Sequence, residues 1–169
     1  EPVSQGEIGE VVVRGTNVMQ GYWNKPEQTE AVLRDGAYWT GDLGYLDEDG
    51  YLFLVDRSKD MIVSGGENVY STEVEDVLYR HPAVLEAAVF GVPDEKWGEG
   101  VWAVGVPRAD HSSIDPAELI AFCHDNIAGY KTPKGIDIQT EPLPKSGPGK
   151  VLKRQLRAPF WEGVDRAVN

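Results

Sequence analysis

The longest apolar run of the chain covers only residues 84–92, and Glu86 interrupts it. A helix that spans a membrane needs about 20 apolar residues, and no segment of this sequence approaches that length. A short valine-rich run bounded by turn residues is instead typical of a buried strand. A second such run, residues 100–106, follows after the turn-rich segment 93–98. The chain is therefore expected to fold around short strands.

Residues 61–169 alternate between strand and helix signals in an order that indicates one small domain. We expect strands at 61–64, 85–92, 100–106 and 134–139. We expect one helix that follows a cap at Ser71 or Thr72 and runs to about Arg80, and further helices at 116–127 and 151–160. Thr72 and Glu75 fit a capping box for the first helix, although Ser71 could cap it instead. The glycine turn at Gly65 and Gly66 is expected to open the same helix. This order is typical of a small α+β domain of about 110 residues.

Residues 1–57 show a different pattern, with several short strands and little helix. We expect a strand at 7–14, a helix at 26–33, and a hairpin of strands 38–46 and 51–56 whose turn is the acidic segment 47–50. So few residues cannot build an independent sheet with a full core. This part is therefore expected to be a β-rich remnant of a larger N-terminal domain. Because the chain starts at Glu1, we also expect it to be a piece of a longer protein.

Composition and charge limit the classes of function. The 169 residues include 16 Lys and Arg against 28 Asp and Glu, for a net charge of −12, which disfavours nonspecific binding to nucleic acid. The segment from residue 129 to residue 157, however, contains seven basic residues and only two acidic residues. This segment can attract a compact polyanion such as a nucleotide, or it can be a solvated charged face. The single cysteine, Cys123, excludes an intramolecular disulfide and is typical of a reducing compartment, so we expect a cytoplasmic protein.

Familiar metal and phosphate motifs do not fit the sequence. The acidic turn at 47–50 lacks the glycine position and the closing glutamate of a calcium loop. Residues 149–150 are not followed by the hydroxyl residue that ends a phosphate-binding P-loop. His81, His111 and His124 are too scattered for a zinc site. We therefore expect that the chain itself holds no metal.

Four segments carry candidate functional residues. Their order along the chain is a more specific indication of function than any one segment alone. Residues 38–44 place a carboxylate between two glycines at the end of a strand. Residues 56–60, Asp-Arg-Ser-Lys-Asp, form a charged run between strands. Residues 64–68, Ser-Gly-Gly-Glu-Asn, form a glycine turn. Residues 144–154 form a mobile Pro/Gly loop that carries Lys150.

Together with residues 6–10 and 21–24, these segments resemble the C-terminal part of the adenylate-forming (AMP-binding) enzymes, the superfamily of acyl-CoA synthetases, nonribosomal peptide adenylation domains and firefly luciferase. The resemblance covers all but about the last ten residues. Residues 65–70 are most similar to the fatty-acyl and aryl-acid CoA ligases, although Ser71 stands where the family usually has proline. The family's phosphate loop and adenine-binding motif do not occur here, so the resemblance implies a large N-terminal domain upstream.

The resemblance implies a two-step reaction. ATP, with Mg²⁺, activates a carboxylic acid to an acyl-adenylate, and the thiol of CoA then displaces AMP. Three parts of the chain are implied as well: a remnant of the large AMP-binding domain at 1–57, a hinge at 58–60, and a mobile lid domain with a short sheet and packed helices at 61–169. The implied partners are a small carboxylic acid, ATP, CoA and the N-terminal domain, without nucleic acid and without a transmembrane segment.

The resemblance also implies roles for single residues. Lys150 would be the catalytic residue, because its ammonium could bridge the substrate carboxylate and the α-phosphate of ATP. Asp42 and Arg57 would bind the nucleotide through its ribose, and Lys59 would be the pivot of the hinge. The CoA contacts would come from Gly65, Gly66, Tyr130 and Lys134. Thr132 stands where some relatives have arginine, which weakens the CoA assignment of Tyr130 and Lys134.

Several alternatives stay open from the sequence. A fatty acid is the favoured substrate and an aromatic acid is the second choice, because the acyl pocket lies outside this chain. The acceptor could be the pantetheine of a carrier protein instead of CoA. The chain could also be a noncatalytic lid module. Even as part of a ligase, the isolated chain is expected to be inactive.

Overall fold

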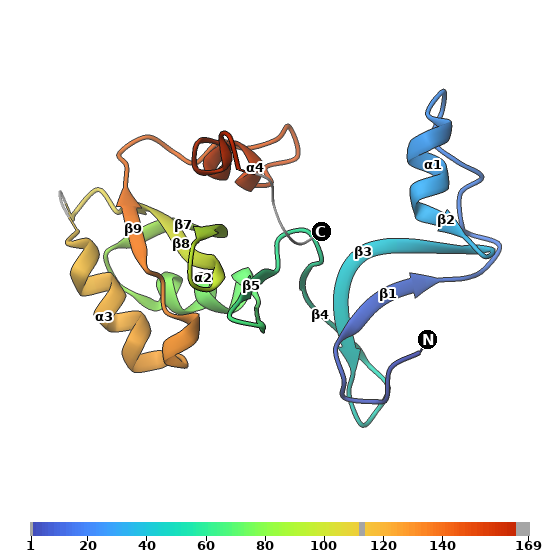
Figure 1. Cartoon of the computed structure of the whole chain (residues 1–169), viewed down its shortest axis with the longest axis horizontal. Helices are drawn as coiled ribbons and strands as arrows, with labels where there is room; N and C mark the ends of the chain where they lie inside the picture. Colours follow the sequence, from blue (N-terminus) through green and yellow to red (C-terminus); the bar gives the residue numbers. More distant parts are fainter. Residues whose placement is uncertain (1, 112–113, 165–169) are drawn as a thin grey trace. The chain divides into compact units, whose positions relative to one another are not determined.

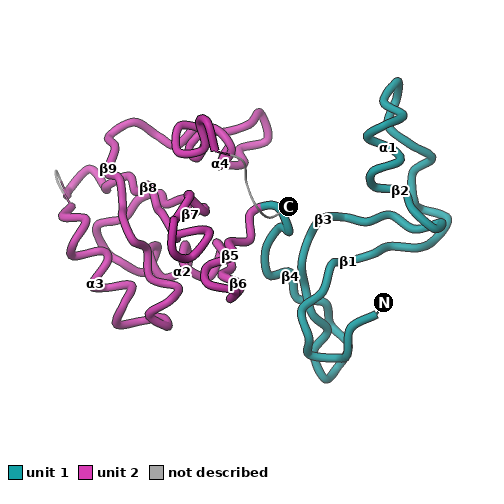
Figure 2. The backbone as a smooth tube through the Cα atoms, viewed as in Figure 1, with its two compact units in different colours: residues 1–59 teal, residues 60–169 magenta. Residues whose placement is uncertain are grey.

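A computed structural model describes residues 2–111 and 114–164; Glu1, residues 112–113 and residues 165–169 lie outside the described part. The chain consists of two compact units, unit 1 with residues 1–59 and unit 2 with residues 60–169 (Figure 2). Helices occur together with mostly antiparallel strands. The expected α+β fold class is therefore confirmed.

Unit 1 is a four-stranded antiparallel sheet. Its elements are β1 (Gly9–Val13), α1 (Pro26–Val32), β2 (Leu33–Arg34), β3 (Ala37–Leu46) and β4 (Leu52–Arg57). The central strand is β3, which pairs with β1 along one edge and with β2 and β4 along the other. The side chain of Asp47 closes the β3–β4 hairpin by accepting hydrogen bonds from the backbone N–H groups of Asp49 and Tyr51. The expected hairpin with an acidic turn is confirmed.

Unit 1 buries very little apolar surface. Among its described residues, Ala37 is the one hydrophobic side chain that is fully buried. Trp23 is 89% exposed, Tyr51 is 69% exposed and Leu54 is 64% exposed. Burial of a large apolar side chain contributes about 1.5–3 kcal/mol to the stability of a fold. Because these side chains are exposed, they contribute little of this energy. Unit 1 is thus a sheet without a full core, as its small number of residues led us to expect.

Unit 2 is built on a five-stranded sheet. Its elements are β5 (Ile62–Ser64), β6 (Glu67–Val69), α2 (Ser71–Arg80), β7 (Val84–Asp94), β8 (Gly98–Pro107), α3 (Pro116–Asn126), η1 (Gly129–Lys131), β9 (Gly135–Ile138), α4 (Lys153–Arg157) and η2 (Ala158–Trp161). The long hairpin of β7 and β8 forms the centre, β5 is antiparallel to β8, and β9 is parallel to β8. The longest helix in the described part of the chain has 11 residues, and none could span a membrane.

Successive side chains of β7 enter two cores on opposite faces of the sheet. Val89 lies in the first core with residues of α2 and α3, among them Leu78 and Leu119. Phe90 lies in the second core, which the C-terminal segment covers with Leu143 and other apolar residues. Figure 1 shows α3 and α4 on opposite sides of the strands. This alternation is the period of two that a strand buried on both faces requires.

The outer edge of β7 is covered by side chains rather than by another strand. The Tyr79 hydroxyl and the Trp161 indole N–H donate to the carbonyls of Ala87 and Gly91, at 3.2 and 3.0 Å. The N–H of Val89 donates to the Glu75 carboxylate at 2.8 Å. An unpaired edge strand would otherwise be a template for aggregation. Residues of α2 and η2 therefore protect this edge.

Two expectations about helices are wrong. Neither Ser71 nor Thr72 is the N-cap of α2, because the residue before the helix is Tyr70, whose side chain makes no capping hydrogen bond; Ser71 is instead buried and accepts a hydrogen bond from Lys153. The C-terminal helix is not continuous, since α4 gives way to the 3₁₀ turn η2 at Ala158. Pro159 explains this change, because it has no N–H to continue the α-helical ladder.

The glycine turn also differs from its expected place. Gly65 and Gly66 do not open α2 directly, because the short strand β6 stands between them and the helix. The turn joins β5 to β6, with Ser64 facing Glu67 across the hairpin. Three residues between a turn and a helix are too few to show a strand pattern, and β6 was therefore missed.

Candidate functional site

Asp42 and Arg57, which the resemblance assigned to the nucleotide, are brought together in unit 1. They face each other on β3 and β4, and the Nε of Arg57 donates a hydrogen bond of 3.1 Å to the Oδ1 of Asp42. The Asp42 side chain is 34% exposed and the Arg57 side chain 47%. An ion pair this open to water contributes little to stability. Both groups thus stay accessible to a ligand.

The expected position of Asp42 at a strand end is wrong, because it lies in the middle of β3. The preceding Gly41 has a φ of +72°, a conformation that favours glycine, and the strand continues through it. The N–H of Gly41 donates to the Glu10 carboxylate at 3.0 Å, and its carbonyl accepts from the N–H of Ser58 at 2.8 Å. Glu10 and the segment after β4 thus fix the backbone that carries Asp42.

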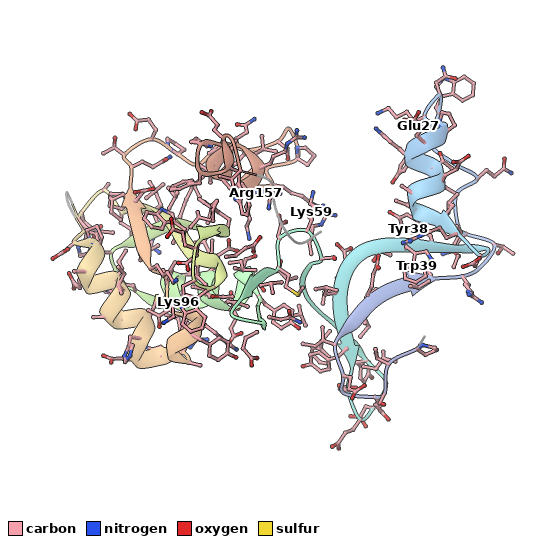
Figure 3. All side chains as sticks on the ribbon, viewed as in Figure 1. Glu27, Tyr38, Trp39, Lys59, Lys96 and Arg157 are labelled. Atoms are coloured by element: carbon pink, nitrogen blue, oxygen red, sulfur yellow. The ribbon has the colours of Figure 1, made fainter. Side chains whose placement is uncertain are left out.

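Lys59 is the last residue of unit 1, on the segment that follows β4 (Figure 3). The next residue, Asp60, belongs to unit 2, where its carboxylate lies 3.9 Å from the guanidinium of Arg157. The side chains of Arg157 and Asp60 are only 19% and 17% exposed. Asp60 is therefore held to α4, and Lys59 is the residue before this fixed point. The hinge role of Lys59 stays a prediction.

Lys150 lies in unit 2 on a loop that its own backbone closes. An antiparallel bridge joins Lys145 and Val151. Between them, the carbonyl of Ser146 accepts from the N–H of Gly149, and the N–H of Ser146 donates to the carbonyl of Lys150, both at 2.8 Å. Lys150 is exposed, and no residue that the structure describes pairs with its ammonium. We call residues 145–151 the lysine loop. It presents an unpaired cation on a defined backbone.

Two Lys–Glu pairs flank the lysine loop. The sequence analysis assigned neither glutamate to the site, and it expected Glu75 only in a capping box. Lys145 donates to Glu86 at 2.6 Å, and Lys153 pairs with Glu75 at 2.7 Å. The hydrogen bond from Lys145 holds the pKa of the Glu86 carboxyl below its usual range, although burial acts in the opposite direction. A charged residue inside the apolar run 84–92 was a usable signal for Glu86. Glu75 gave none, because a carboxylate on an amphipathic helix is ordinary.

Gly65 and Gly66 have φ values of +62° and +88°. Two successive residues with positive φ are what a two-residue type I′ hairpin turn needs. The ring of Trp97 lies against one side of this turn, since a Cβ on Gly65 would come within 2.7 Å of it. The N–H of Gly65 also donates to the carbonyl of Trp97 at 2.9 Å. A Cβ on Gly66 would meet nothing within 4 Å, so that side of the turn is open.

Lys134 belongs to the same neighbourhood through the turn between β7 and β8. Its ammonium pairs with one carboxylate oxygen of Asp94, and the other oxygen accepts from the N–H groups of Lys96 and Trp97. Lys96, labelled in Figure 3, lies over the Trp97 ring at 4.4 Å from its centre. The hydrogen bond from Lys134 holds the pKa of Asp94 below its usual value. The structure thus brings Gly65 and Lys134 together around this turn, which the sequence indicated only as a turn-rich segment.

Tyr130 lies on η1 and is 49% exposed. Its nearest charged neighbour is Lys131, whose ammonium is 5.7 Å from the ring centre and pairs with Glu73 at 2.7 Å. Burial is the largest single influence and lowers the pKa of Lys131, but the hydrogen bond and charge of Glu73 together with Tyr130 outweigh it, and the pKa is raised. Among the described residues, no contact links Tyr130 to the β7–β8 turn whose Asp94 pairs with Lys134. Its role at CoA stays a prediction.

No three His, Cys, Asp or Glu side chains in the described ranges 2–111 and 114–164 lie close enough together to hold a metal ion. Cys123 is fully buried in the first core, and burial raises the pKa of its thiol to about 11. A thiol so protonated is a poor nucleophile and a poor ligand. Cys123 is therefore a packing residue of the first core.

Residues 73–150 match the family of the AMP-binding enzyme C-terminal domain. The chain is 54% identical over 160 residues to a feruloyl-CoA synthase of Amycolatopsis sp, a match that covers 95% of this chain and 32% of that protein. It is 50% identical over 150 residues to a long-chain-fatty-acid–CoA ligase of Bacillus subtilis (strain 168), with 89% of this chain and 26% of that protein covered. The chain thus spans about a third of the length of the curated relatives it matches.

The solved structures agree with these relatives. The ATP-bound MatB from Rhodopseudomonas palustris superimposes with a TM-score of 0.85 at 40% identity, over 94% of this chain and 31% of that one. At this identity the likeness concerns the family and not the fold alone. The chain therefore belongs to the adenylate-forming (AMP-binding) enzymes and carries their C-terminal domain.

Proposed function

We propose that the full-length protein is an acid–CoA ligase to which this chain contributes the mobile C-terminal lid. In the first half-reaction a carboxylate attacks the α-phosphate of ATP and releases pyrophosphate. In the second, the CoA thiol attacks the acyl carbon and releases AMP. The observation that carries the proposal is the unpaired ammonium of Lys150, which the closed lysine loop presents to solvent in a chain of this family.

Lys150 acts in the first half-reaction. Negative charge accumulates where the substrate carboxylate meets the α-phosphate, and a compact ammonium is suited to neutralise it. Loss of one such preorganised contact costs on the order of 3–4 kcal/mol, or about 10²–10³ in rate. No residue in the described part of the chain pairs with the Lys150 ammonium, which favours this role, because Lys150 need not break such an ion pair before it binds substrate.

Asp42 and Arg57 hold the nucleotide. Each oxygen of the Asp42 carboxylate can accept a hydrogen bond from a ribose hydroxyl, and the guanidinium of Arg57 keeps donors beyond the one bound to Asp42. Their pairing at 3.1 Å orients the carboxylate before the nucleotide arrives. Mg²⁺ would enter with ATP as its phosphate complex, since the described residues offer no cluster of metal ligands.

The second half-reaction uses another surface of the lid. We propose that unit 2 rotates about residues 58–60, with Lys59 as pivot, so that Lys150 withdraws and the turn of Gly65 and Gly66 approaches the acyl-adenylate. Glycines allow close approach of the backbone to the pantetheine arm of CoA. Lys134 would then exchange Asp94 for a phosphate of CoA, and Tyr130 would pack near the adenine.

The test of the proposed function varies the acid substrate and the acyl acceptor. One relative is named for feruloyl-CoA and another for a long-chain fatty acid, so both acid classes belong in the assay. The full-length protein should be incubated with ATP, Mg²⁺, and either a hydroxycinnamic acid or a long-chain fatty acid, with CoA or a pantetheinylated carrier protein as acceptor. Formation of AMP and acyl-CoA supports the proposal. Acyl transfer to the carrier alone, or no acid-dependent pyrophosphate release, would contradict it.

A further inference from the structure

The geometry points to Glu75 and Glu86 as positioning residues that set the lysine loop for adenylation. The inference rests on the proposed role of Lys150. The two carboxylates do not touch Lys150. They bind the lysines on either side of the loop, Lys145 at its first residue and Lys153 two residues beyond its last. Each end of the loop is thus tied to a partly buried carboxylate.

The first tie is made by Glu86 on β7. One oxygen of its carboxylate accepts from the Lys145 ammonium at 2.6 Å, and the other accepts from the N–H of Leu143 at 3.1 Å. Leu143 is itself buried in the second core. Because a single carboxylate binds both the backbone and the side chain just before the loop, the N-terminal end of the loop cannot move without breaking two charge-assisted hydrogen bonds.

The second tie is made by Glu75 on α2. The ammonium of Lys153 is bound at 2.7 Å by Glu75 and at 2.6 Å by the hydroxyl of Ser71. The same oxygen of Glu75 accepts from the N–H of Val89 on β7 at 2.8 Å. The side chains of Lys153 and Glu75 are only 14% and 15% exposed, so the pair is largely shielded from water. The C-terminal end of the loop is therefore fixed to the same strand that carries Glu86.

Between the two ties, the loop holds its shape through four backbone amides. Ser146, Gly149, Lys150 and Leu152 each donate a hydrogen bond within the segment from Pro144 to Leu152. These bonds set the shape of the loop, and the two glutamates set its place on the domain. A displacement of about 1 Å of a group that must meet the reacting atoms can cost about 100-fold in rate. Loss of either tie should therefore slow adenylation without removing the ammonium.

The test compares Glu86→Gln and Glu75→Gln with a matched control in the full-length protein. Glu73→Gln is the control, because Glu73 lies on the same helix as Glu75 and makes a Lys–Glu pair of the same length, 2.7 Å, with Lys131, away from the loop. Glutamine keeps the size of each side chain. Lys145→Arg is the conservative rescue, because it keeps a charged donor opposite Glu86.

Three quantities are measured: acyl-adenylate formation, thioester formation from supplied acyl-adenylate, and amide exchange of residues 144–152. For the Glu75 and Glu86 variants we expect kcat of adenylation to fall about 10- to 100-fold, with KM for ATP and acid little changed. Thioester formation should persist, and the amides of Gly149, Lys150 and Leu152 should exchange faster. Glu73→Gln and Lys145→Arg should adenylate like the wild type.

Three results would overturn the inference: unchanged adenylation in both glutamine variants, equal loss in both half-reactions, or an equal loss in Glu73→Gln. An equal loss in both half-reactions would mean that the pairs serve only stability, since a broken buried pair destabilises the whole fold. Lys150→Ala, assayed alongside, separates this inference from the proposed function. If Lys150→Ala leaves adenylation intact, the proposed role of Lys150 is wrong. If Lys150→Ala impairs adenylation but the two glutamine variants do not, the positioning role of Glu75 and Glu86 is wrong.

Discussion

The turn of Gly65 and Gly66 allows a prediction in which two adjacent glycines behave differently. Both have positive φ, so alanine at either position costs about 1–2 kcal/mol of backbone strain. At Gly66 this is the whole cost, because its Cβ would meet nothing within 4 Å. At Gly65 the Cβ would come within 2.7 Å of the Trp97 ring, and overpacking adds about 1–3 kcal/mol.

Trp97 is 44% exposed and can move outward, so we expect the added cost at Gly65 to be near the lower limit. Gly65→Ala should then lower the free energy of unfolding of the chain by about 2–3 kcal/mol and Gly66→Ala by about 1–2 kcal/mol. Urea denaturation measures both values. In the full-length protein, Gly65→Ala should also slow thioester formation from supplied acyl-adenylate, because it displaces Trp97 from the side of the turn.

A double-mutant cycle isolates the contact. In a Trp97→Ala background, the Gly65→Ala and Gly66→Ala variants should cost the same, since only the strain remains. If the two variants already cost the same in the wild type, or if Gly65→Ala stays more costly without the ring, the reasoning about this turn is wrong.

Three further predictions concern the hinge, the isolated chain and pH. Lys59→Pro fixes φ and removes an N–H donor, so acyl-adenylate should still form while its transfer to CoA slows; unchanged transfer with unchanged melting would remove Lys59 from the mechanism. The isolated chain should make no acyl-CoA from ATP, Mg²⁺, CoA and a fatty acid, and any turnover would contradict this prediction. Amide exchange should be faster in residues 1–59 than in residues 70–111, and the reverse order of exchange would contradict it. Because the pKa of Glu86 is lowered in the folded state, its contribution is complete at neutral pH and is lost as the pH falls through that lowered pKa. The stability difference between wild type and Glu86→Gln should therefore shrink in acid, and a difference that grows there would refute this.

Most strands and helices followed from local pattern, but the two-residue strand β2 was not expected. The runs 84–92 and 100–106 became β7 and β8 because apolar residues bounded by turns have few other stable arrangements in a small domain. The hairpin of β3 and β4 followed from its acidic turn. β6 could not be found in this way, because three residues carry no period. The start of α2 was misread because Ser71, a good cap by type, is used by Lys153 across 82 positions of sequence.

The site was predicted in its residue types but not in its connections. Asp42 and Arg57 were both assigned to the ribose but not to each other, and the structure shows them as facing partners on one hairpin. Lys134 and Gly65 were both assigned to CoA, but the turn that joins them, with Asp94 and Trp97, was not assigned to the site. Such contacts depend on how segments that are distant in the sequence pair in the fold, and a single sequence does not reveal this pairing. Glu75 was missed for the same reason.

The central claim is that Lys150 serves the first half-reaction and not the second. The most direct measurement is made on Lys150→Ala in the full-length protein, with acyl-adenylate formation and thioester formation from supplied acyl-adenylate followed separately. We predict a loss of about 10²–10³ in adenylation, because no other described cation lies on the lysine loop without a partner, and thioester formation close to that of the wild type. Equal loss in both half-reactions, or unimpaired adenylation, would contradict the account.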